Sequence, residues 1–426
     1  MFHKIFFSEK NENFEKNENS EKNENSEKNE NSEKNENSEK VYRSKDLLED
    51  VLEDLSLDEN KDEFNTNGFM VNKVTNRIVF SNNSSIESNK LNNTKYLVIK
   101  EIGYGAFSNV YLAYSKNENN EDEDFKKYIL KTTRCNSIYI KQAVEEYICY
   151  NKLNNKSNFI IHFIEYFNIP NETNHIIPCL VLEYFNENFY TYTKKNFGMF
   201  YGLDIDILFV LTRTMIMGID FLHQHNIIHC DLKPENIVIN TKKQCKIIDL
   251  GSAIKPGYNK KNSYMQSRYY RSPNCIVSCD INPRIDYWSI GCVMYESLTM
   301  VPLFAKKSEY GVLLKQLRFI EIPHNKINKC NSLVKSMYNY DSKKWRTDVE
   351  KMHLFDYLNL VLDKKFIKRL TYENEWLFNT KTGYCSLLNM CILDHYNEND
   401  NNYVKQFEIV EAAYKSESKF PSIPAI

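Results

Sequence analysis

Hydrophobic positions are almost absent from residues 8–40. Residues 8–40 repeat Ser-Glu-Lys-Asn-Glu-Asn, and every full copy carries two glutamates and one lysine. Such a segment has little apolar surface to bury against an ordering cost of roughly 1–2 kcal/mol per residue, so we expect residues 1–40 to be disordered. The tail is either an inert low-complexity expansion or a docking or regulatory element.

The next segment, 41–95, predicts one helix and a linker. Four apolar residues fall at i, i+3, i+4 and i+7 with acidic residues between them: Leu48, Val51, Leu52 and Leu55. This stripe predicts an acidic amphipathic helix, which either packs on the body of the protein or binds a partner. Residues 61–94 are rich in Asn and Ser and include one strand-like piece at 76–81, which indicates a linker with one hairpin that packs on the rest of the protein.

Short apolar runs of strand length then follow one another, and each is bounded by polar residues. The runs cover 97–99, 110–114, 128–131, 159–167 and 178–184. Residues 138–153, between the third and fourth runs, show helical periodicity instead. The pattern predicts a sheet interrupted by one helix.

The second half of the chain is predicted to be mainly helical. Its longest apolar stretch, 205–222, contains Asp206, Arg213 and Asp220, which favours a buried helix over a membrane span. A further helix is expected around Asp286. Two short apolar runs that flank a polar turn at 240–243 predict a hairpin.

Composition narrows the classes of partner. A net charge of −2 argues against nucleic acid as a bulk electrostatic partner. No run approaches about twenty apolar residues, so no membrane partner is expected. The eleven cysteines are scattered without paired spacing, which favours reduced thiols and an intracellular location, cytoplasmic or nuclear.

Residues suited to phosphoryl transfer are concentrated between 229 and 273. This reaction needs an acid beside the attacking hydroxyl, a cation near the transferred group and oxygen ligands for Mg²⁺. Asp231, Lys233 and Asn236 precede the predicted hairpin, and Asp249 follows it. One short segment therefore supplies every kind of group required.

A glycine-rich turn and a lysine lie upstream. Gly103 and Gly105 would let the backbone approach phosphates closely. Lys131 closes an apolar strand, where a buried ammonium needs anionic partners. We expect Glu146 to be one of them rather than the adjacent Glu145, because three neighbours on the same helix place Glu146 nearer the apolar side: Ala143, Tyr147 and Tyr150.

These motifs together resemble a eukaryotic protein kinase over roughly residues 96–378. Three details resemble the dual-specificity tyrosine-regulated kinases in particular: His229-Cys230-Asp231, the string at 264–273, and residues 285–292. The resemblance implies an α+β bilobed fold, with a small β-rich nucleotide lobe and a larger, mainly α lobe. It also implies a helix over 308–322. Residues 379–426 would be an extension of uncertain structure.

The resemblance also assigns roles, with ATP and Mg²⁺ as cofactors and Ser or Thr of protein substrates as acceptors. Asp231 would accept the hydroxyl proton, Lys233 would steady the γ-phosphate, and Lys131 with Glu146 would align the nucleotide. Asn236 and Asp249 would hold Mg²⁺. The remaining nucleotide contacts would come from the glycine-rich turn, the residue gating the adenine pocket and the hinge: Gly103, Gly105, Ala106, Val110, Leu182, Glu183 and Phe185.

Regulation is expected at Tyr264, which the resemblance makes a site of autophosphorylation, although Asn262 replaces the first tyrosine of the usual pair. Cys230 stands where many kinases carry an arginine that holds a phosphate on this loop. Arg268 and Arg271 are therefore expected to hold it instead.

Other departures from the family pattern leave two alternatives open. Ile129 replaces an alanine at the adenine wall, Leu250 replaces the Phe after the metal-binding aspartate, and Asn274 replaces a glutamate that normally pairs a buried arginine, here Arg369. A pseudokinase or scaffold with weak nucleotide binding is one alternative. A splicing-factor kinase of a sister group is the other.

Deleting residues 1–40 tests the interpretation of the tail. A disordered segment contributes no buried area, so the unfolding midpoint and peptide phosphorylation should not change. Thermal unfolding and a kinase assay on both forms measure this. Loss of stability or activity would instead show that the repeat binds the rest of the protein.

Overall fold

The computed structural model describes the following residues: 69–71, 78–80, 84–88, 94–105, 107–115, 125–134, 136–169, 177–196, 205–257, 265–277, 281–323, 327, 332–339, 342, 344–345, 349–361, 384–393 and 402–417. The repeat at 8–40 and the predicted acidic helix lie outside them, as do Ala106, Tyr264 and Arg369.

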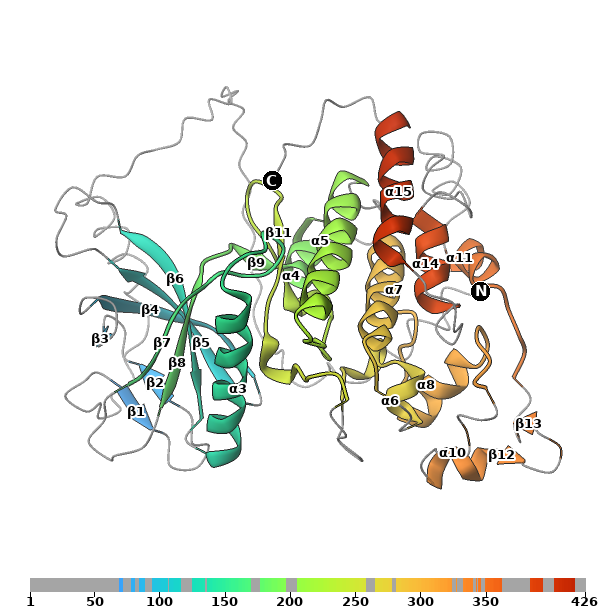
Figure 1. Cartoon of the computed structure of the whole chain (residues 1–426), viewed down its shortest axis with the longest axis horizontal. Helices are drawn as coiled ribbons and strands as arrows, with labels where there is room; N and C mark the ends of the chain where they lie inside the picture. Colours follow the sequence, from blue (N-terminus) through green and yellow to red (C-terminus); the bar gives the residue numbers. More distant parts are fainter. Residues whose placement is uncertain are drawn as a thin grey trace, which may run out of the picture. The chain divides into compact units, whose positions relative to one another are not determined.

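The predicted strand runs build one antiparallel sheet of six strands in the order β3-β4-β5-β6-β8-β7 (Figure 1). Its strands are β3 (Ser85–Glu87), β4 (Lys95–Tyr104), β5 (Ser108–Ser115), β6 (Lys126–Thr133), β7 (Phe163–Asn168) and β8 (Pro178–Glu183). Strand β7 starts later than the apolar run predicted, because Ile160 bridges to Ile247 in another part of the chain. Strand β3 lies within 61–94 and is additional to the one hairpin that was expected in this linker.

The predicted strand-like piece does form a strand. β1 (Phe69–Val71) pairs with β2 (Ile78–Phe80) as an antiparallel hairpin. The Phe80 ring meets Tyr111 of β5 edge-on, with ring centroids 4.8 Å apart. Phe80 and Ile86 are buried in one apolar cluster with side chains of the sheet, so the segment before the predicted domain start covers part of it.

Helix α3 (Ser137–Leu153) starts where the Asn136 side chain accepts the Ile138 N–H, and it ends at Asn154 in the left-handed conformation. Its buried positions follow helical spacing: Ala143, Glu146, Tyr150 and Leu153. Helix α3 contacts β6, β7 and β8, and Figure 1 shows it alongside the sheet. One face of this helix therefore points a carboxylate at the sheet.

The described residues after β8 are mainly helical, as predicted. Among those up to residue 361, the structure gives α4 (Phe189–Asn196), α5 (Ile205–Gln224), α6 (Pro273–Ile276), α7 (Arg284–Thr299), α8 (Glu309–Gln316), α10 (Ser332–Met337) and α11 (Leu354–Val361). Helix α8 is shorter than the predicted 308–322. The predicted hairpin is formed by β10 (Ile237–Ile239) and β11 (Cys245–Ile247), and β9 (Glu187–Asn188) pairs with β10 as a third strand. Separately, β12 (Tyr338–Asn339) pairs with β13 (Lys344–Trp345).

Within the extension of uncertain structure, the described residues form α14 (Tyr384–Ile392) and α15 (Tyr403–Glu417). The Tyr403 ring stacks on Tyr287 of α7 at 3.7 Å, and the Phe407 ring stacks on Phe209 of α5 at 5.5 Å. Both helices thus belong to the main hydrophobic core. None of the described helices is long and apolar enough to cross a membrane.

The packing of α14 on α7 predicts an unusual effect of Gly291→Ala. Alanine normally stabilises a helix interior relative to glycine by about 1 kcal/mol. Here the added Cβ would lie 2.7 Å from Ile392 Cδ1 and 2.9 Å from Cys391 Cβ. We expect overpacking to lower the free energy of unfolding by about 1–3 kcal/mol, measured by denaturant titration.

Gly311→Ala in α8 is the matched control, since its nearest neighbour is the exposed Lys306 side chain. This variant should be close to neutral. Equal stability of Gly291→Ala and wild type would contradict the packing of α14 on α7.

Candidate active site

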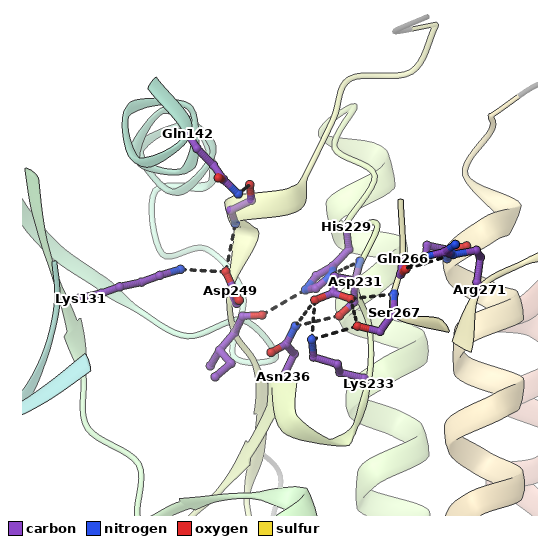
Figure 2. Close-up of polar contacts among 12 residues, drawn as sticks. Lys131, Gln142, His229, Asp231, Lys233, Asn236, Asp249, Gln266, Ser267 and Arg271 are labelled. Carbon is purple, nitrogen blue, oxygen red and sulfur yellow. Dashed lines mark hydrogen bonds and ion pairs between the residues drawn. The ribbon is translucent and has the colours of Figure 1, made fainter. Parts of the chain in front are cut away.

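Lys131 is held between two carboxylates. Its Nζ lies 2.8 Å from both carboxylate oxygens of Glu146 and 2.8 Å from Asp249 Oδ1 (Figure 2 shows the contact with Asp249). Glu146 is buried, whereas Glu145 is exposed. The lysine on β6 is therefore paired with the expected glutamate, and it also contacts the aspartate after β11.

The mutual pairing controls the charges of these groups. Burial alone would lower the pKa of Lys131, but Asp249 and Glu146 raise it above its ordinary value. Burial acts to raise the pKa of Asp249, yet the Lys131 ammonium dominates and lowers it to about 2. Burial raises the pKa of Glu146, and Lys131 partly offsets that effect. Asp249 is thus an anion at neutral pH.

Asp249 sits in a turn that contacts α3. It has φ 67° and ψ 78°, in the left-handed region that side chains other than glycine rarely adopt. Its Oδ1 accepts the Gly251 N–H at 3.2 Å, and Gln142 of α3 donates to Gly251 O at 2.6 Å. A Cβ at Gly251 would lie 3.1 Å from Asp249 Oδ1 and 3.3 Å from Glu146 Oε2, so the glycine keeps this site open.

Asp231 is surrounded by donors. Lys233 Nζ donates to its Oδ2 at 2.7 Å, and Asn236 Nδ2 donates to its main-chain oxygen at 2.8 Å. Ser267 donates to Oδ1 twice, from its Oγ at 2.7 Å and from its N–H at 3.1 Å. Figure 2 shows the four residues converging. Ser267 was not predicted as a site residue, although it stands in the quoted string at 264–273.

A buried aspartate fixes the loop that carries Asp231. Asp286 of α7 accepts the N–H groups of His229 and Cys230 at 2.8 and 2.9 Å, and it lies 2.9 Å from His223 Nε2. His229 Nδ1 in turn accepts the Asp231 N–H at 3.2 Å. A core position of His229 that orients this loop was expected, whereas the two hydrogen bonds to Asp286 were not, although Asp286 lies in a family motif.

The expected nucleotide contacts line β4, β5, β6 and the end of β8. Gly103 pairs with Val110, and Val110 pairs with Lys131, so these three lie side by side across the sheet. Gly105 donates to Ser108 O at 2.8 Å in the glycine-rich turn. Ala106 lies outside the described residues.

The predicted hinge, which includes Glu183 and Phe185, contacts β11, the strand that precedes Asp249. Leu182 is buried and Phe185 is partly buried. The Glu183 carboxylate pairs with Lys246 of β11 and accepts the His162 N–H at 2.6 Å. The adenine end and the metal end of the expected site are therefore linked through β11.

The two arginines expected to hold a loop phosphate differ in environment. Arg271 is buried; its guanidinium donates to Gln266 O and pairs with Glu309. Arg268 is exposed and donates to Lys307 O at 2.7 Å. Tyr264 lies outside the described residues, so its relation to either arginine stays a prediction.

Cys230 lies where other kinases place an arginine. It is buried in an apolar cluster with Ile228, Ile254 and Ile285, against which Met265 packs. The loop that contains Met265 is therefore held here by apolar contacts. This agrees with the expectation that Cys230 itself holds no phosphate.

The other departures are placed as follows. Ile129 lies two residues before Lys131 on β6, so both side chains point to the same face of the sheet. Across the sheet, Ile129 is paired with Leu182 of β8. Leu250 is buried in the main core, and Asn274 is also buried. The expected partner of Asn274, Arg369, lies outside the described residues.

Three features define the protein kinase class: a sheet with one helix, a helical region, and a lysine that pairs with two carboxylates. Residues 96–374 match the protein kinase domain family. Since this is more than half of the chain, the protein belongs to that family, whose members use ATP.

Its relatives include several dual-specificity kinases. The rat dual specificity tyrosine-phosphorylation-regulated kinase 3 is 32% identical over 252 residues, which are 58% of this chain and 40% of the relative. The mbk-2 kinase of this type from Caenorhabditis elegans is 31% identical over 54% of the chain and 27% of the relative. The serine/threonine-protein kinase prp4 of Schizosaccharomyces pombe is 33% identical over 52% and 45%.

The predicted resemblance to the dual-specificity tyrosine-regulated kinases is thereby confirmed. The chain matches less than half the length of each of these relatives.

Ser267→Ala should slow peptide phosphorylation with little change in the KM for ATP. The hydroxyl donates to Asp231 and accepts from Lys233 at 3.1 Å, and a hydrogen bond to a charged group contributes about 1.5–3 kcal/mol. We expect kcat to fall roughly 10-fold or more. Ser267→Thr keeps the hydroxyl and is the control. Equal kcat for wild type and both variants would show that the Ser267 hydroxyl does not contribute to catalysis.

Proposed function

We propose that this protein transfers the γ-phosphoryl group of Mg·ATP to Ser and Thr hydroxyls of protein substrates. The observation that carries the proposal is the pairing of Lys131 with both Glu146 and Asp249. It places a cation and an ionised carboxylate together, as alignment of a triphosphate and its metal requires.

The residues present fit a magnesium nucleotide. The Asn236 nitrogen is bonded to Asp231, so its amide oxygen points away from that residue, as Figure 2 shows. Asp249 is ionised and 41% of its side-chain surface is exposed. An amide oxygen and a carboxylate are ligands that Mg²⁺ prefers. When bound, Mg²⁺ would neutralise charge on the phosphates.

The roles of the chain's own groups follow from these contacts. Asp231 would accept the proton of the substrate hydroxyl, because its carboxylate is fixed by Asn236, Lys233 and Ser267. Lys233 would remain a cation beside the transferred group. Lys131, held by Glu146, would orient the α- and β-phosphates. No covalent intermediate with the protein is needed.

We further propose Ser/Thr specificity toward substrates, supported by Lys233 two residues after the base, together with autophosphorylation of Tyr264. The names of the dual-specificity relatives favour both activities. An intracellular location is proposed as well, since the reaction needs ATP and the cysteines lack paired spacing. The partner of the acidic segment before residue 61 remains a prediction.

A peptide-library assay on purified wild type and Asp249→Asn tests the main proposal. Wild type should phosphorylate Ser/Thr peptides, and Asp249→Asn should lose transfer almost completely, because it lacks the anionic metal ligand. Transfer by neither protein, with nucleotide binding retained, would instead support the pseudokinase alternative, for which the extra bulk of Ile129 is the favouring feature.

The regulatory proposal has its own test by mass spectrometry. Recombinant wild type made without added kinase should carry phosphate on Tyr264, and Asp249→Asn should not. A phosphotyrosine adds about −1.5 to −2 charge, which exposed Arg268 could bind, so Tyr264→Phe should lower activity. Fully active wild type with unmodified Tyr264 would refute this mechanism.

A further inference from the structure

The backbone of Asp249 adopts a conformation that requires support. Its φ of 67° and ψ of 78° are disfavoured for any residue with a Cβ, and such geometry persists only where surrounding contacts enforce it. Two of those contacts come from its own turn and from Lys131. A third comes from a tyrosine that the sequence suggested only as an apolar position of the helix.

That residue is Tyr150 of α3. Its hydroxyl accepts the Asp249 N–H, with 3.2 Å between the oxygen and the nitrogen. The ring is buried and stacks on Phe163 of β7, with centroids 6.1 Å apart and planes at 11°. The ring cannot shift without disturbing that stack, so the hydroxyl is presented to Asp249 from a fixed position.

Burial also fixes the chemical state of this hydroxyl. Burial and the nearby Glu146 carboxylate raise the pKa of Tyr150 well above its ordinary value. The phenol therefore stays neutral throughout the physiological range, and its oxygen accepts hydrogen bonds as a hydroxyl. Phenylalanine at this position would preserve the ring and remove only the acceptor.

Tyr150 follows Glu146 by one turn of α3. The same helix therefore carries one carboxylate partner of Lys131, Glu146, and contacts the other, Asp249. Glu146 binds the lysine side chain, and Tyr150 binds the main chain of the aspartate. Gln142, one turn earlier on α3, donates to Gly251 O of the same turn. Three successive turns of α3 thus contact the lysine or the Asp249 turn.

We propose that Tyr150 is a positioning residue for the proposed metal ligand Asp249: its hydroxyl holds the aspartate in the left-handed conformation that directs the carboxylate to Lys131. The inference rests on the proposed function in one respect, namely that Asp249 binds Mg²⁺ together with ATP. Removing the hydroxyl leaves the ring packing intact but deprives the Asp249 N–H of this acceptor.

The first readout is hydrogen exchange of the purified protein without nucleotide or metal. In Tyr150→Phe, peptides that include the Asp249 amide should exchange roughly 10-fold faster than in wild type, because a net hydrogen bond of typical strength is lost. Tyr147→Phe is the matched control. Tyr147 lies on the same helix, and its ring stacks on Tyr166 at 4.6 Å.

The second readout is ATP binding by calorimetry with and without Mg²⁺. Tyr150→Phe should bind ATP roughly 10-fold more weakly than wild type in Mg²⁺ and equally well without it. Tyr147→Phe should match wild type in both conditions. Unchanged exchange and unchanged Mg²⁺-dependent affinity in Tyr150→Phe would overturn the inference.

Asp249→Asn separates this result from a failure of the proposed function. If it keeps Mg²⁺-dependent ATP binding, Asp249 is not the metal ligand and the proposed function fails at that residue. If it loses that binding while Tyr150→Phe behaves as wild type in both readouts, only the role of Tyr150 fails. Thermal unfolding of each variant verifies that the proteins compared are folded.

Discussion

The structure depends on one ammonium group that is largely shielded from solvent and is shared by two carboxylates. Lys131 comes from β6, Glu146 from the helix that follows it, α3, and Asp249 from the turn after β11. Their pairing therefore joins the sheet and its helix to a residue 118 positions after Lys131. A buried charge without its partner is strongly destabilising. These contacts therefore fix the position of α3 and the conformation of the Asp249 turn. The same contacts place two carboxylates beside the Lys131 ammonium.

A second buried charge does the same for the catalytic loop. Asp286 lies at the start of α7, a helix that is buried along nearly its whole length. By accepting two consecutive N–H groups of the loop, it fixes the backbone that presents Asp231. Helices α14 and α15 pack on α7 and α5, so the C-terminal part of the chain supports the site through the core rather than through direct contact.

Much of the site could be predicted because its residues occur in short strings with fixed chemistry. Asp231, Lys233 and Asn236 lie close together in the sequence, and the periodicity of α3 favoured Glu146 over Glu145, as did the family resemblance. Contacts across the fold could not be predicted in this way. Ser267 meets Asp231 across 36 residues and Tyr150 meets Asp249 across 99. Strand β3 and helices α14 and α15 were also not predicted from the sequence. They are formed by packing against the rest of the protein rather than by a local sequence pattern.

Phosphotransfer by Lys131→Met is the measurement that tests the central claim most directly. The Lys131 cation aligns the phosphates in this account, so folded variant protein should bind peptide normally and lose transfer almost completely. Because the buried Glu146 loses its cation, the variant should also have a lower free energy of unfolding than wild type. Lys126→Met, on the same strand but exposed, should keep wild-type activity. Undiminished transfer by folded Lys131→Met protein would contradict the claim that the ion-paired lysine is the organising group of the site.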